Sequence, residues 1–253
     1  MKCVVLQPSY IPWRGYFHQI HKADVFVFYD DVQYDKRGWR NRNRVKTPWG
    51  SQWLTIPVYA KGCQLHHTPI HQIRICWDRD WITQHWNALK LAYCKAPFFR
   101  AYGPLLEGFY RSRPTLLADL TIEMTKALAY ELGINRTQFM RSSSLHPSSN
   151  PSGSKTDHLV AILKTLGATH YITGPSAKDY LEEDKLAEAG ISLEYMVYDY
   201  PEYEQLYPPF DPYVSILDLL FMKGPEASRY IWSDDTALLP AEPLPALSGR
   251  GHL

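Results

Sequence analysis

Residues 155–200 read KTDHLVAILKTLGATHYITGPSAKDYLEEDKLAEAGISLEYMVYDY, a segment in which helical and extended patterns alternate. Apolar residues recur at helical spacing from Lys155 to Leu166, and HYITG follows as a short strand-like run. A second helix is expected from Lys178 to Ala189, followed by the strand ISLEYMVYDY. Because alternating strands and helices favour parallel pairing, the segment predicts an α/β fold with a mostly parallel sheet and flanking helices.

The same alternation extends toward the N-terminus. The strand TQFMRSS precedes the loop LHPSSNPSG, and CVVLQ is a buried strand that ends at a proline-bearing loop. A helix is expected from Gly15 to Ala23 and a strand from Val25 to Tyr29, with amphipathic helices at Arg79 to Tyr93 and Leu116 to Leu132. Ligands of parallel sheets bind at the carboxyl ends of the strands. Those ends are predicted at Gln7-Pro8, Asp30-Asp31, Ser142-Ser144 and Gly174-Ser176.

Composition limits the class of protein. The chain has 253 residues, of which 45% are hydrophobic, enough to build a substantial core. We expect a single α/β domain over residues 1–232 and a Pro-rich, disordered tail over residues 233–253. Lys and Arg number 27 against 26 Asp and Glu, so no overall field favours nucleic acid as a partner.

The pattern of apolar residues predicts a cytoplasmic protein. The run from Cys3 to Leu6 is too short for a signal-peptide core, and charges or prolines interrupt every other apolar stretch, so no membrane insertion is expected. The four cysteines form no C-x-x-C pair and are expected to be reduced thiols. The composition does not indicate an oligomeric state.

Three stretches resemble the WbqC-like family. They are QPSYIPWRGYFHQIHKADVFVFYDDVQYDKRGWRNRNRVK, KTDHLVAILKTLGATHYITGPSAKDYL and YPPFDPYVSILDLLFMKG, and together they cover nearly all of the chain from Met1 to Gly224. The resemblance implies a bacterial transferase that acts on a small polar or sugar substrate in O-antigen-like surface-polysaccharide biosynthesis. Aminoacyl transfer, such as that of glycine, to a nucleotide-linked or lipid-linked sugar is one form of that reaction.

The order strand, proline-bearing loop, aromatic helix start and strand is also similar to nucleotidylyltransferase-like, and thus Rossmann-like, adenylate-forming enzymes. Those enzymes carry a His-x-Gly-His turn, whereas this chain has Pro12, Trp13, Arg14 and Gly15 there. An ATP-dependent amide-forming ligase is therefore an alternative function, in which ATP is the cofactor. A non-catalytic protein that binds a glycan precursor or a partner is a third.

The basic loop after the second strand is the strongest candidate site. Arg42 and Lys36 are expected to hold phosphate or carboxylate, and Asp31 to deprotonate an acceptor. A solvated hairpin with turn-forming Asp and Asn is the other interpretation of the loop. The residues expected to bind substrate there are Asp30, Gln33, Trp39, Asn41 and Asn43.

Other loops are expected to complete the binding site. Their side chains offer stacking surfaces, amides and helix N-terminal N–H groups, although core packing and N-capping explain the same residue types without a ligand. The candidates are Gln7, Tyr10, Trp13, Tyr16, Ser154, Lys155, Thr156, Gly174, Ser176, Tyr203 and Gln205.

Two histidine patterns have competing interpretations. His85 lies between Trp81 and Leu89 on an apolar helix face, so it is either a core histidine or a catalytic base near neutral pH. The cluster Cys63, His66, His67 and His71 has a spacing unlike that of closed zinc sites and is interrupted by a proline. No metal is expected.

Overall fold

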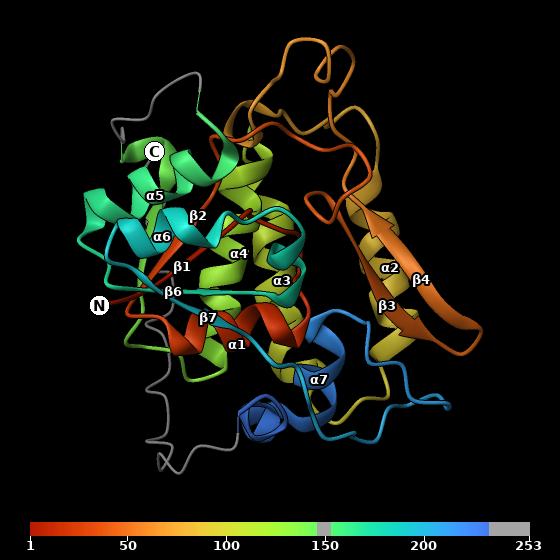
Figure 1. The fold of residues 1–253 in the computed structure, drawn as a ribbon. Helices are drawn as coiled ribbons and strands as arrows, with labels where there is room; N and C mark the ends of the chain where they lie inside the picture. Colours follow the sequence, from red (N-terminus) through yellow and green to blue (C-terminus); the bar gives the residue numbers. More distant parts are fainter. Residues whose placement is uncertain (146–152, 233–253) are drawn as a thin grey trace, which may run out of the picture.

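The structure, a computed structural model, describes residues 1–145 and 153–232 (Figure 1). Its central sheet has five parallel strands in the order β5-β2-β1-β6-β7. The strands are β1 (Lys2–Leu6), β2 (Val25–Phe28), β5 (Gln138–Arg141), β6 (His170–Thr173) and β7 (Ser192–Tyr195). This α/β sheet confirms the predicted fold class. Since the strand order reverses between β1 and β6, that junction is the switch point at which parallel sheets bind ligands.

Helices cover both faces of this sheet. One face packs against α1 (Arg14–Lys22) and α4 (Leu117–Glu131), and the other against α5 (Lys155–Leu166) and α6 (Glu183–Glu188). Alternate strand residues supply the two cores, because successive side chains of a strand point to opposite faces. Val4 therefore lies in the larger core with α1 and α4, whereas Val5 lies in the smaller one with α5 and α6.

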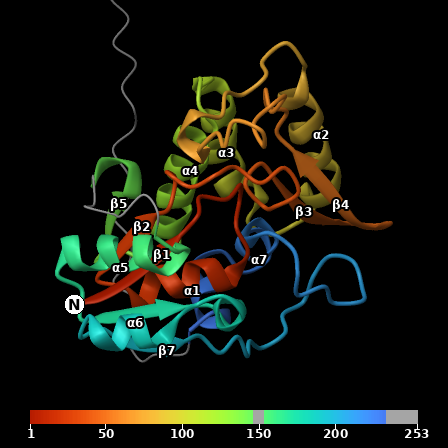
Figure 2. The same cartoon turned by 45° about the horizontal axis from the view of Figure 1, so that its top comes forward.

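A second group of elements extends the larger core. The hairpin of β3 (Arg42–Thr47) and β4 (Gly50–Thr55) packs beside α2 (Trp81–Tyr93), away from the central sheet (Figure 2). The remaining helices of the described residues are α3 (Phe99–Ser112), α7 (Ile216–Lys223) and the 3-10 turns η1 (Ile70–Gln72), η2 (Ser142–Ser144), η3 (Pro175–Asp179) and η4 (Gly224–Tyr230). No helix of the described residues is long and apolar enough to cross a membrane.

Two expected elements are shorter than their sequence patterns. The helix expected over Lys178 to Ala189 is wrong in extent, because η3 ends at Asp179 and α6 begins only at Glu183. Leu181 is buried in the smaller core and Glu182 donates its backbone N–H to Thr156 Oγ1, which ends the first helical turn. The last strand stops at Tyr195. The residues expected as a disordered tail, 233–253, lie outside the described residues.

The loop between β1 and α1 is held in a strained conformation. Ile11 has φ of 38°, a left-handed value that costs free energy for a β-branched residue. Asn43 Nδ2 fixes this loop by donating to the carbonyl oxygens of Tyr10 and Ile11 at 3.1 and 2.8 Å. Gly15 is required beneath the Trp13 ring, because a Cβ there would lie 2.4 Å from a ring carbon. The hairpin therefore shapes the loop that follows β1.

We predict that Asn43→Ala lowers the free energy of unfolding by roughly 1–3 kcal/mol, because it leaves two buried carbonyl groups without their donor. Urea denaturation measures the change. Asn87→Ala, on the exposed side of α2, is the matched control and should leave stability nearly unchanged. Equal stability of the two variants would show that Asn43 does not hold the loop.

Candidate functional site

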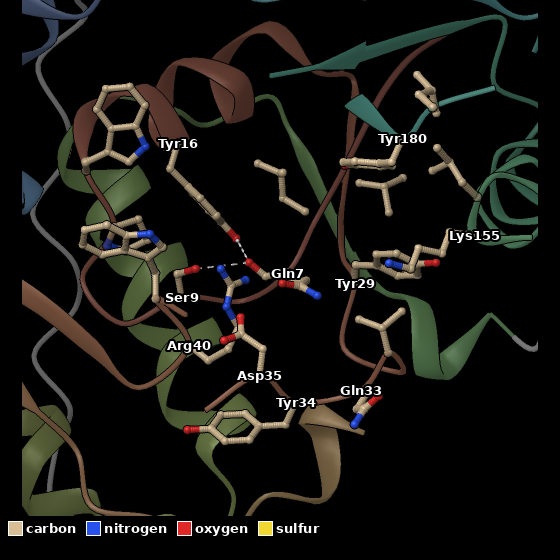
Figure 3. Close-up of a pocket in the computed structure, with 18 of the residues that line it drawn as sticks. Gln7, Ser9, Tyr16, Tyr29, Gln33, Tyr34, Asp35, Arg40, Lys155 and Tyr180 are labelled. Atoms are coloured by element: carbon tan, nitrogen blue, oxygen red, sulfur yellow. Dashed lines mark hydrogen bonds between the residues drawn. The ribbon is translucent and has the colours of Figure 1, made fainter. Parts of the chain in front are cut away.

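A cavity of about 870 Å³ opens at the carboxyl end of β1, at the switch point of the sheet. Its walls come from the β1–α1 loop, the loop that follows β2, the hairpin and the start of α5 (Figure 3). Such a volume suits a small organic molecule. The residues that line it include Leu6, Gln7, Ser9, Trp13, Tyr16, Tyr29, Tyr34, Asp35, Trp39, Arg40, Arg44, Lys155, Tyr171, Tyr180 and Tyr213.

Arg40 is an unpaired cation in this cavity. Its guanidinium points toward Gln7 and Ser9 (Figure 3), and it forms no hydrogen bond or ion pair with any described residue. Its Nε is shielded from solvent and has no partner. Burial lowers the pKa of Arg40, an effect that Tyr16 and Asp35 oppose. A guanidinium stays charged in proteins, and because Asp35 forms no ion pair with it, the hydrogen-bond donors of Arg40 remain open to an anionic ligand.

Two further polar groups face the cavity without a protein partner. The carbonyl of Gln7 accepts from Ser9 Oγ and Tyr16 Oη at 3.4 and 3.1 Å, but its side-chain amide bonds to no described residue. The ammonium of Lys155, at the first turn of α5, likewise has no ion pair within the described part of the chain. The cavity thus offers an amide and two cations without a protein partner to a ligand, and Arg44, which donates to the Tyr213 carbonyl, is a third cation in its lining.

The walls between these groups are mostly aromatic. The tyrosines and tryptophans provide flat apolar faces, and burial raises the pKa of Tyr29 and raises that of Tyr34 to about 12. Both phenols are therefore neutral donors at physiological pH. Asp35 supplies the one carboxylate among the described residues that line the cavity, and its Oδ1 accepts from the backbone N–H of Arg37 at 2.9 Å.

Several residues expected from sequence line the cavity. They are Gln7, Trp13, Tyr16, Gln33, Trp39, Asn43, Lys155 and Thr156. The side chains of four of them already have protein partners, however, and one of these is Tyr16, which donates to the Gln7 carbonyl. Gln33 bonds to Gln64 and His67, Thr156 accepts from Glu182, and Asn43 holds the β1–α1 loop.

Asp30 and Asp31 lie outside the cavity lining and join β2 to β5. Asp30, fully buried, pairs with Arg141 Nε at 2.7 Å and accepts from Ser143. Asp31 accepts from Ser142 Oγ at 2.6 Å and faces His158 Nε2 at 3.0 Å. Burial acts to raise the pKa of Asp31, but the bonds from His158 and Ser142 outweigh it and lower the pKa.

Arg42, Lys36 and Asn41 also lie outside the lining. Arg42 stacks over the Trp53 ring at 4.5 Å and donates to the carbonyl of Arg37. Lys36 is exposed on the loop, and the amide of buried Asn41 donates to the carbonyl of Ile56 at 2.8 Å. Arg40 and Arg44, not Arg42, are the arginines of this segment that line the cavity.

His85 and Tyr10 belong to a buried chain of hydrogen bonds. His85 Nε2 lies 3.1 Å from the Thr55 carbonyl, which only accepts, so Nε2 carries the proton and Nδ1 accepts from Tyr10 Oη at 3.0 Å. Tyr10 is bonded in turn to Tyr110 at 2.5 Å. Burial lowers the pKa of His85 to about 4, so the ring is neutral at physiological pH. The geometry is that of a core histidine.

The remaining candidates lie outside the cavity lining. Ser154 caps α5 through a capping box with Asp157, and Gly174 and Ser176 lie at the start of η3. Tyr203 donates to Asp218 at 2.8 Å, and Gln205 bonds to the backbone of Asp211.

Sequence reasoning missed much of the cavity wall. The missed residues include Ser9, Tyr29, Tyr34, Asp35, Arg40, Tyr171, Tyr180 and Tyr213. A signal for Arg40 does exist, because Arg40-Asn41-Arg42-Asn43-Arg44 alternates with the period of a strand. Its asparagines are buried and its arginines lie on the other side.

The histidine cluster does not gather around one point. Cys63 is buried, His67 contacts Gln33, and His71 Nδ1 bonds to the carbonyl of Asp30. Among the described residues, no group of three or more His, Cys, Asp or Glu side chains could hold a metal ion.

The chain is thus an α/β protein with an aromatic, cationic cavity at the switch point of its sheet. The chain matches the WbqC-like protein family over residues 7–230 and belongs to that family. It is also 40% identical over 232 residues to the uncharacterized protein Rv1507c of Mycobacterium tuberculosis (strain ATCC 25618 / H37Rv), covering 91% of this chain and 97% of the relative. No solved structure matches the chain significantly.

We predict that His85 makes stability fall as pH decreases from about 6.5 toward 4. Its pKa is about 4 in the fold and 6.5 in the unfolded chain, so the unfolded chain binds more protons in this window. His85→Gln should remove up to roughly 3 kcal/mol of that pH dependence. Urea denaturation across this pH range tests it, with exposed His66→Gln as the control. An unchanged pH dependence in His85→Gln contradicts a neutral core histidine.

Proposed function

We propose that the cavity binds the anionic part of a nucleotide-linked or lipid-linked sugar and that the protein is a transferase of surface-polysaccharide assembly. The observation that carries the proposal is the unpaired guanidinium of Arg40 beside Gln7 and Ser9. A guanidinium binds phosphate or carboxylate through two parallel hydrogen bonds. In this proposal the protein works in the bacterial cytoplasm, and glycine or another aminoacyl group is one group it transfers.

The other groups of the cavity fit the remainder of such a ligand. Tyr16 and Tyr29 offer flat surfaces to a sugar or base ring, and the Gln7 amide can both donate to and accept from a hydroxyl. Lys155 provides a second cation as a point charge. Asp35 is the lining carboxylate that can accept a proton from an acceptor hydroxyl, in the role that the sequence suggested for Asp31.

We predict that Arg40→Met weakens binding of nucleoside-diphosphate sugars at least about tenfold, because it removes a charge-assisted contact and little packing. Isothermal titration calorimetry with a panel of these sugars, and with inorganic pyrophosphate as the minimal anion, measures the effect. Arg37→Met is the matched control, since Arg37 is exposed on the same loop. Equal binding by both variants contradicts the proposed anion site.

A second candidate, the ATP-dependent amide-forming ligase, is favoured by the position of the cavity at a Rossmann-like switch point. Its phosphates would have to be held by Arg40 and Lys155. Magnesium bound to ATP usually has carboxylate ligands from the protein, and Asp35 is the one carboxylate among the described lining residues.

Because Pro12-Trp13-Arg14-Gly15 replaces the His-x-Gly-His turn, we predict that millimolar Mg-ATP leaves the melting temperature unchanged, whereas the bound nucleoside-diphosphate sugar raises it. Thermal denaturation with each ligand separates the two functions. A shift caused by Mg-ATP, and lost in both Arg40→Met and Lys155→Met, would make the ligase the better account.

A further inference from the structure

Three arginines follow one another along the loop and hairpin. Arg40 lines the cavity, and Arg42 and Arg44 lie on the same side of the alternating segment, on β3. The Nε atom of each is shielded from solvent and unbonded, and none of the three forms an ion pair with a carboxylate of the described residues. We call these three residues the arginine row: Arg42 and Arg44 lie roughly 7 Å apart along β3, at about 3.3 Å per extended residue, and Arg40 lies in the bend before the strand. Asp35 acts on Arg40 and Asp211 acts on Arg44 through space, but neither carboxylate forms an ion pair with the arginine row.

Exposed rings lie beside the outer end of the row. Trp53 lies directly across the hairpin from Arg44, and its ring contacts Arg42 at 4.5 Å and Arg44 at 5.7 Å. Trp39 packs at 5.2 Å from Trp53, and each keeps 43% of its surface exposed, while Tyr213 is 65% exposed. Trp39, Trp53 and Tyr213 form an aromatic ledge on the open side of the hairpin.

The aromatic ledge continues the cavity wall. Trp39, Arg44 and Tyr213 line the cavity. Trp53 lies outside the lining, but its ring contacts both Trp39 and Arg44. Arg44 joins them by donating to the Tyr213 carbonyl at 3.0 Å. A ligand whose end occupies the cavity can therefore extend over Trp53 and stay in contact with charged and aromatic side chains along its length.

The chemistry of this surface selects the ligand. Arginine forks recognise carboxylates and phosphates, and tryptophan rings stack against the apolar faces of sugars and bases. Single-stranded nucleic acid shares both features, but its binding proteins present a basic groove that follows the strand. Here the formal net charge is only +1, and the inner wall of the cavity is formed by Val5 and Leu6 at the end of β1.

We propose that the arginine row and aromatic ledge form an extended subsite for an acidic oligosaccharide whose terminal sugar enters the cavity. This inference rests on the proposed sugar-binding function and names the acceptor class. Carboxylates of successive sugars bind Arg40, Arg42 and Arg44, while sugar faces stack on Trp39 and Trp53. Affinity then depends on chain length.

Calorimetry with galacturonate and with oligogalacturonates of increasing length tests the proposal. Wild-type protein should bind a tetramer at least tenfold more tightly than the monomer. Arg42→Gln and Trp53→Ala should both lose that gain while keeping monomer affinity, and neutral malto-oligosaccharides should show no gain. Trp49→Ala is the matched control, because Trp49 is 81% exposed at the hairpin turn and lies outside the ledge.

The outcomes separate the subsite from the cavity. Arg40→Met should weaken the binding of every chain length by the same factor. If Arg40→Met instead leaves monomer binding intact and affinity still rises with chain length, the extended subsite is supported and the cavity site is contradicted. The extended subsite is overturned if the wild type does not bind these saccharides or binds the tetramer no more tightly than the monomer. It is also overturned if Arg42→Gln and Trp53→Ala both keep the full increase in affinity from monomer to tetramer. Equal or tighter binding of an oligodeoxythymidylate overturns it in favour of nucleic acid.

Discussion

The alternation from Arg40 to Arg44 links the fold to the site. Asn41 and Asn43 are buried, and Asn43 holds the carbonyl groups of the strained loop that follows β1. Arg40 lies in the bend before β3 and lines the cavity together with Asn43 and Arg44. One short segment thus fixes the shape of the first loop and supplies the charge of the cavity.

The rigidity of this arrangement has consequences for binding. The Ile11 conformation is compensated by hydrogen bonds and by burial, so the loop is shaped before a ligand arrives. Asp30 and Asp31 likewise fix the end of β2, because their carboxylates bind Arg141 and the start of η2. The sequence suggested a binding or catalytic role for these two carboxylates, but in the structure they hold strand ends together. The groups without a protein partner in the cavity are mainly cationic and aromatic.

Much of the fold follows from local pattern. Strand and helix periods in residues 155–200 were enough to predict the parallel α/β sheet and the edge at which the cavity lies. They could not predict α3, whose interior contains Pro104, or the early end of the helix at η3, which depends on burial of Leu181. Local periodicity carries no information on such long-range packing.

The site was predicted only in part for the same reason. The position of strand-end residues such as Gln7 was predicted correctly because the sheet topology places strand ends at the cavity. Which of Arg40 and Arg42 lines the cavity depends on the hairpin register and on the contacts of Asn43, and neither can be read from the sequence. His85 had two interpretations until its partners Tyr10 and Thr55, remote in sequence, were known. Residue type alone did not separate these cases.

The central claim is that Arg40 gives the cavity affinity for an anionic, sugar-containing ligand. Mass spectrometry of small molecules released from protein purified rapidly from its native cells tests it most directly. The account predicts a phosphate- or carboxylate-bearing sugar compound in wild-type protein and its loss from Arg40→Met. A neutral ligand, or the same compound retained by Arg40→Met, would contradict it.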